Sequence, residues 1–164
     1  MMEIKLTHGY VALVDDEDFA LVEPYTWHTH WDHGKYKYAR TMIPGGKRIF
    51  MHVMISAAAS GEKPEGIMVD HRDGNGFDNR RDNLRYCTRS QNLANQPPRN
   101  SRSLPKGVYK RLDRFAAMIC VNGKTTYIGS YDTPEEAGRA YDRAALEGFG
   151  EFAFTNDPRH RGPC

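Results

Sequence analysis

Cysteine is scarce in this chain of 164 residues, and the three that occur, Cys87, Cys120 and Cys164, are far apart in the sequence. An odd number of isolated cysteines excludes a disulfide framework and a four-thiolate zinc site, so we expect free thiols in a reducing compartment. No apolar run is long enough to cross a bilayer, and the first residues lack the basic and then apolar pattern of a secretory signal. We therefore expect a cytoplasmic protein without a membrane partner.

The chain also has little net charge, formally +2, but its basic residues are concentrated in one stretch. Between Arg80 and Arg114 there are ten basic and two acidic residues, a local charge of +8, so the rest of the chain carries −6. Such a stretch suits a partner with a dense negative backbone, because each Lys or Arg placed on a phosphate releases condensed counterions. A basic face that contacts only solvent is the simpler interpretation.

The composition, 39% hydrophobic and 27% charged, is that of a globular α+β chain with small modules. Residues 1–50 are rich in β-branched and aromatic types punctuated by turn residues, which predicts short antiparallel strands. The expected strands cover residues 10–14, 25–31, 35–40 and 47–50.

The central part, residues 51–96, combines helical and loop signals. An Ala-rich helix is predicted from His52 to Ala59, followed by a loop dense in Gly, Asn and Asp. A short strand over 84–88 and a polar helix over 90–96 complete this part. Residues 97–106 lack apolar periodicity and are expected to form a basic linker.

The clearest local signals lie in residues 107–157. Asn122-Gly123 between two apolar runs predicts a hairpin, because both turn positions need positive φ. Thr133, Pro134 and Glu136 form the start of a helix with a capping box, and we expect this helix to end at Gly148. Three strands packed on one helix are therefore predicted.

One segment combines Asp, Asn and Gly with apolar anchors at fixed positions. It runs from Val69-Asp70-His71 to Asn83-Leu84, and a polar stretch ending at Asn92 follows. The segment resembles the HNH nuclease family, in the variant with Asn in place of the final His, over about a third of the chain. A turn-rich loop without chemistry is the alternative. An EF-hand is excluded, because Arg72 and Gly74 stand where that loop needs Asp or Asn.

The resemblance implies a ββα-metal core and a role for each matching residue. His71 would be the general base, Asp70 and Asn92 the metal ligands, and Asn83 the residue that orients the loop. A histidine titrates near neutrality and can accept a proton from water. One carboxylate and one amide oxygen suit Mg²⁺ or Mn²⁺, which keep several waters and take phosphate oxygens as further ligands.

Other histidines are open to two interpretations. His52 starts the predicted helix, where it would either touch DNA phosphate or cap or brace the site. His28, His30 and His33 lie together, but no acidic or Cys partner stands at a known ligand spacing. We expect a partly exposed aromatic strand there rather than a zinc site.

Residues 107–157 resemble the Apetala-two/ethylene-response-factor DNA-binding domain of plants, on Gly107-Val108-Tyr109, Tyr127-Ile128-Gly129 and Thr133-Pro134-Glu135-Glu136. In that family the sheet enters the major groove. The usual Trp of the second strand is Phe115 here, which puts base specificity in doubt. Over the whole chain, the residues expected to contact double-stranded DNA are His52, Arg80, Arg81, Arg85, Arg89, Arg99, Arg102, Lys106, Lys110, Arg111, Arg114, Lys124, Thr126 and Tyr127.

Together these observations predict a site-preferring, metal-dependent DNA endonuclease, a monomer or weak dimer that nicks DNA. The arrangement resembles homing or mobile-element endonucleases of phages and bacteria, acting in the bacterial or phage-infected cytosol. A catalytically inactive sequence-specific DNA-binding regulator is the alternative, and a defence or packaging nuclease with little sequence preference is a third.

Overall fold

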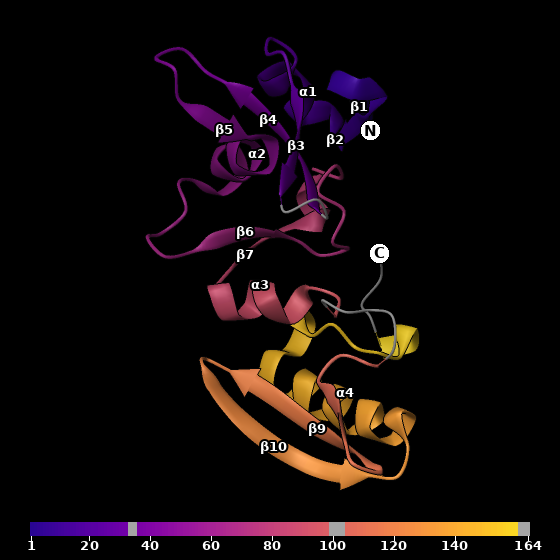
Figure 1. Cartoon of the computed structure of the whole chain (residues 1–164). Helices are drawn as coiled ribbons and strands as arrows, with labels where there is room; N and C mark the ends of the chain where they lie inside the picture. The colour runs from indigo at the N-terminus through magenta and orange to yellow at the C-terminus, as the bar shows by residue number, and fades with distance from the viewer. Residues whose placement is uncertain (33–35, 99–103, 161–164) are drawn as a thin grey trace. The chain divides into compact units, whose positions relative to one another are not determined.

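A computed structural model describes residues 1–32, 36–98 and 104–160. The chain divides into two compact units, residues 1–87 and 88–164 (Figure 1). Both mix helices with antiparallel sheets, so the predicted α+β class is confirmed. Within the described ranges, no helix has the length and apolar character needed to span a membrane.

The first unit contains three small antiparallel sheets. Their strands pair as β1–β2, β3–β4–β5 and β6–β7. The elements in chain order are β1 (Met2–Lys5), β2 (Val11–Val14), α1 (Asp16–Val22), β3 (His28–Asp32), β4 (Tyr36–Met42), β5 (Arg48–Phe50), α2 (Met51–Ser60), β6 (Met68–His71), the 3₁₀ turn Arg81–Asn83 and β7 (Leu84–Cys87).

One hydrophobic core serves the whole first unit. Its fully buried members come from the N-terminal segment, such as Val14 and Trp27, and from α2, where Met51 and Ile55 contribute. Phe77 and Leu84, from the loop and strand that follow, pack against the same cluster. Residues 1–50 are therefore part of the body that holds the Asp-His segment.

The second unit is a sheet covered by one long helix. Its elements are α3 (Arg89–Asn95), β8 (Val108–Arg111), β9 (Arg114–Val121), β10 (Lys124–Tyr131) and α4 (Pro134–Phe149), and the sheet order is β10-β9-β8. Small residues of α4, Ala137, Ala140 and Ala145, pack against Ala117 and Ile119 of β9. This is the predicted three-stranded sheet on one helix.

The local signals of the second unit are confirmed with one exception. Asn122 and Gly123 have φ of 50° and 81°, and Thr133 accepts a hydrogen bond from Glu136 N in the predicted capping box. The prediction that the helix ends at Gly148 is wrong, because α4 continues to Phe149 and Gly150 supplies the positive φ. A Cβ at Gly148 would lie 3.2 Å from Val121 Cγ2, so this glycine allows close helix–sheet packing.

Two elements of the first unit were not predicted. Strand β1 pairs with β2, and α1 follows β2 directly. Helix α1 has seven residues and starts with Asp16, Glu17 and Asp18, so it lacks the apolar periodicity that identifies longer helices.

Candidate active site

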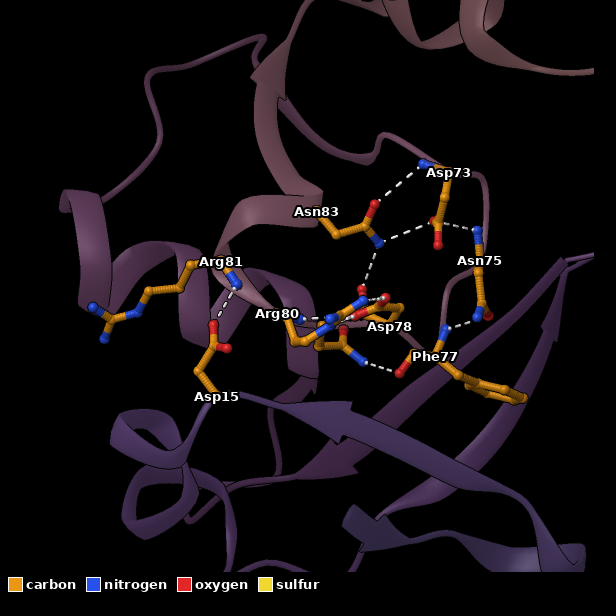
Figure 2. A network of polar contacts seen from close by, with 9 residues as sticks. Asp15, Asp73, Asn75, Phe77, Asp78, Arg80, Arg81 and Asn83 are labelled. Atoms are coloured by element: carbon orange, nitrogen blue, oxygen red, sulfur yellow. Dashed lines mark hydrogen bonds and ion pairs between the residues drawn. The ribbon is translucent and has the colours of Figure 1, made fainter. Parts of the chain in front are cut away.

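The Asp-His segment ends β6, and the residues after it form a tightly bonded loop (Figure 2). Asn83 closes the loop: its Oδ1 accepts from Asp73 N at 3.1 Å, and its Nδ2 donates to Asp73 Oδ1 at 2.9 Å and Asp78 O at 2.8 Å. Within the loop, Asp73 Oδ1 also accepts from Asn75 N, and Asn75 Oδ1 from Phe77 N. The predicted loop-orienting position thus carries three hydrogen bonds across the loop.

His71 is buried, 5% exposed, at the end of β6. Its Nε2 lies 3.4 Å from Asn79 Oδ1, and Asn79 Nδ2 donates to Phe77 O at 3.0 Å. Because the amide nitrogen is used on a carbonyl, the amide oxygen faces the ring and can only accept. A neutral His71 then carries its hydrogen on Nε2, and Nδ1 is the ring's proton acceptor. Burial lowers the pKa of His71, which favours this neutral form.

Asp70 forms a buried ion pair across the β6–β7 hairpin. The register places Asp70 opposite Arg85, and Arg85 Nε and Nη2 both donate to Asp70 Oδ2, at 3.1 and 3.0 Å. The two side chains are only 7% and 6% exposed. Arg85, predicted to contact DNA, therefore compensates the charge of the predicted metal ligand inside the protein.

His52 is the second residue of α2 and packs edge-on against His71, with ring centroids 4.9 Å apart. It is also stacked on Phe50 at 5.4 Å and tilted against Tyr38 at 5.4 Å. Its Nδ1 is buried and has no hydrogen-bond partner in the part of the chain that the structure describes. Burial together with His71 holds the pKa of His52 well below its usual value. This packing favours the bracing role over direct phosphate contact, since the ring is only 8% exposed.

The N-terminal segment holds the loop by backbone hydrogen bonds. Leu13 N donates to Phe77 O and Asn79 N donates to Leu13 O, both at 2.8 Å. A Cβ at Gly76 would lie 2.1 Å from Lys37 O and 2.7 Å from the Tyr38 ring, so the loop approaches β4 as closely as a glycine permits. The position of Asn79 beside His71 therefore depends on residues far away in the sequence.

A second attachment involves Arg81 at the other end of the loop. Its backbone N–H donates to Asp15 Oδ2 at 2.8 Å (Figure 2). The guanidinium binds Asp18 through Nε and Nη2, at 2.8 and 2.6 Å, and Glu17 through Nη1 at 2.8 Å. Asp18 is almost fully buried in α1, so Arg81 is its charge partner inside the protein.

Further basic residues predicted to contact DNA also have partners within the chain. Arg80 donates to both carboxylate oxygens of Asp78, which lowers the pKa of that acid. Lys106 donates to three carbonyl oxygens at the end of α3, those of Leu93, Ala94 and Gln96. Burial lowers the pKa of Lys106 to about 8. Arg89 is exposed, whereas Arg99 and Arg102 lie outside the described residues.

Asn92, the predicted second metal ligand, lies on α3 in the second unit. The helix begins with a capping box between Thr88 and Gln91. It is attached to its own unit by the Lys106 contacts and by a hydrogen bond from Phe154 N to Ala94 O.

The predicted DNA contacts on the C-terminal sheet divide between its two faces. Directly opposite residues of an antiparallel pair share a face. Lys110 is opposite Phe115, Thr126 opposite Ile119 and Lys124 opposite Val121. Phe115, Ile119 and Val121 pack with the residues of α4, so their three polar partners are on the sheet face that this helix covers. The outward face carries Arg111, Arg114 and Tyr127, together with Tyr109, which is 57% exposed and was not predicted.

The donor set fits a hard divalent cation with few protein ligands. No group of three or more His, Cys, Asp or Glu side chains that could hold a metal occurs among the described residues. His28 and His30 lie in β3, while His33 lies outside the described part. A buried carboxylate such as Asp70, with an amide oxygen as the second donor, matches the sparse oxygen set with which Mg²⁺ keeps its waters.

Comparison with known proteins identifies the class. Residues 50–94 match the sequence model of a family described as HNH endonuclease. The chain is 33% identical over 151 residues to an uncharacterized HNH endonuclease of Acanthamoeba polyphaga mimivirus, covering 90% of this chain and 75% of that protein. This chain therefore belongs to the HNH endonuclease family.

Two other similarities cover shorter stretches. The chain is 31% identical over 105 residues to protein 3.8 of Escherichia phage T7, covering 62% of this chain and 86% of that protein. It is also 44% identical over 61 residues to APETALA2-like protein 2 of rice, covering 36% of this chain and 14% of that protein.

Proposed function

We propose that this protein is a metal-dependent DNA endonuclease that hydrolyses one phosphodiester bond per active site. The observation that carries the proposal is the environment of His71. The ring is buried, its Nε2 faces the oxygen of a fixed amide, and its pKa is lowered. A neutral imidazole with Nδ1 as acceptor is the form that a general base needs at neutral pH.

In this mechanism Nδ1 of His71 takes the proton from the attacking water. Asn79 keeps the ring in the correct tautomer, and Asn83 keeps the loop that carries Asn79 in place. His52 packs on His71 and limits the orientations of its ring. A base whose ring cannot turn reaches the reacting water without reorganisation.

Asp70 and, from the motif spacing, Asn92 would hold the divalent cation, Mg²⁺ or Mn²⁺. When bound, the cation offsets charge on the scissile phosphate and on the leaving 3′ oxygen. Arg85 fixes the Asp70 carboxylate by two hydrogen bonds and so orients one ligand before the metal arrives.

The C-terminal sheet would bind the DNA that this site cleaves. The similarity to an APETALA2-like protein supports the resemblance of residues 107–157 to the Apetala-two family, and that resemblance implies a sheet that reads double-stranded DNA. Arg111, Arg114 and Tyr127 on the outward face are the proposed contacts, with Lys110, Lys124 and Thr126 at the sheet edges. Arg89, Arg99 and Arg102 would contact the phosphate backbone of the DNA. Site-preferring cleavage of the homing or mobile-element type follows from combining a reading module with a nuclease.

The test is cleavage of supercoiled plasmid with Mg²⁺ or Mn²⁺, comparing the native chain, His71→Ala and the exposed control His8→Asn at matched DNA occupancy. We expect metal-dependent nicking by the native chain and the control, and none by His71→Ala. DNA binding without cleavage by all three would instead support a catalytically inactive DNA-binding regulator.

A further inference from the structure

The sheet β3–β4–β5 has one face that does not contribute to the core. Ala39 and Thr41 of β4 are 0% and 5% exposed and face inward. Arg40 and Met42 alternate with them and therefore point to the other side. The register sets His28 opposite Arg40 and Arg48 opposite Met42, so all four share this outer face. His28 and Arg48 are exposed, and Met42 is 59% exposed.

This outer face is continuous with the candidate active site. His30 of β3 contacts Phe50 of β5 at 5.5 Å between ring centroids, and Phe50 stacks on His52. Tyr38 of β4 lies 5.4 Å from His52 and 5.9 Å from His71. A row of rings within the first unit thus connects the outer face to the proposed base.

The charge of the face indicates what it would bind. Arg40 and Arg48 contribute two guanidinium groups, and the one carboxylate in the sequence of these three strands is Asp32, at the end of β3. Guanidinium groups match phosphate oxygens in geometry as well as in charge. The rings of His30, Tyr38 and Phe50 on the same face are partly exposed and add a surface for the sugar and base edges.

We propose that the outer face of the β3–β4–β5 sheet is a second DNA-docking surface, which holds the duplex on one side of the scissile phosphate. This proposal rests on the proposed nuclease function. A strand rises about 3.3 Å per residue, so Arg40 and Met42 lie roughly 7 and 13 Å along β4 from Tyr38. At about 3.4 Å per base pair, the face would cover about four base pairs beside the cleavage point.

The experiment separates binding from cleavage. Fluorescence anisotropy measures Kd for a 5′-labelled duplex of about 30 base pairs without divalent metal, over a series of salt concentrations. The variants are Arg40→Gln, Arg48→Gln and the double variant, and Lys63→Gln is the control because this exposed lysine follows α2 outside the sheet. Circular dichroism and thermal melting establish that each variant is folded.

We expect the double variant to weaken binding by roughly 3- to 10-fold and to reduce the slope of log K against log salt by about 2, since each phosphate contact contributes about 0.9. Lys63→Gln should match the native chain in both measurements. Native affinity and slope in the double variant, or an equal change in Lys63→Gln, would overturn the docking surface. If the native chain fails to nick plasmid while the Arg variants lose affinity, the nuclease proposal fails and the docking surface stands.

Discussion

Asn79 lies between His71 and Phe77, and its side chain has no exposed surface. We expect Asn79→Ala to lower kcat by roughly 10- to 100-fold with little change in DNA affinity, because His71 loses the acceptor that fixes its tautomer. Single-turnover cleavage and anisotropy would measure the two effects separately.

A conservative variant distinguishes this role from a structural one. Asn79→Asp keeps an acceptor for His71 Nε2 and adds a negative charge, which raises the pKa of the imidazole. Compared with Asn79→Ala, we expect Asn79→Asp to restore much of the cleavage rate above pH 8. We also expect the acid limb of its pH–rate profile to move to higher pH than in the native protein. A profile unchanged from the native protein would contradict the assignment of Asn79 to His71.

Buried His52 makes stability depend on pH. Burial and His71 hold its folded pKa well below the ordinary value of 6.5, so the unfolded chain binds a proton that the folded chain does not. The free energy of unfolding is therefore not reduced by this group above about pH 6.5. Below that pH it falls by up to about 1.4 kcal/mol per pH unit for each such ring, because only the unfolded chain binds the proton.

Urea unfolding at pH 7.5 and 5.5 measures this loss. Both tryptophans, Trp27 and Trp31, lie in the first unit, so their fluorescence reports on that unit. We expect His52→Gln to lose less stability than the native chain between the two pH values, the remainder coming from His71. An equal loss in both proteins would mean that His52 is not the titrating group.

At the scale of elements, the contact between α1 and the 3₁₀ turn is made by Arg81. Because the Asp18 carboxylate is only 2% exposed, Arg81→Met leaves an uncompensated buried charge. We expect the first unit to unfold at a clearly lower urea concentration than in the native chain. Glu17→Gln removes an exposed partner of the same arginine and should cost less than about 1 kcal/mol.

The double variant Arg81→Met/Asp18→Asn tests the pair directly. Removing the charge of Asp18 as well should recover most of the loss, because no buried carboxylate then lacks a partner. If Arg81 served only as a DNA contact, Arg81→Met would leave urea unfolding unchanged and would weaken DNA binding instead.

Elements with strong local signals could be predicted from the sequence, and those held by distant contacts could not. The Asn122-Gly123 turn and the Thr133 cap depend on adjacent residues, so the sequence identifies them. Asn79 was missed because its position depends on Leu13, and Tyr38 was missed because its contact with His71 comes from a sheet far away in sequence. Motif spacing therefore does not identify two side chains of the site, the buried amide of Asn79 and the partly exposed ring of Tyr38.

At the scale of the whole molecule, a single proposed active site per chain, at Asp70 and His71, limits what one protein can cut. The two strands of a duplex are antiparallel, so a monomer with one active site cleaves one strand in each binding event. We expect supercoiled plasmid to convert to open circles first, with linear DNA appearing later and in proportion to a higher power of protein concentration.

A time course at limiting protein, resolved on agarose gels, measures this order of products. His71→Ala mixed with native chain at equal amounts is the control, because inactive chains in an obligate dimer would suppress linear product more strongly than nicking. Direct conversion of supercoiled to linear plasmid at limiting protein would show that two active sites act together, and the monomeric nicking enzyme would then have to be abandoned.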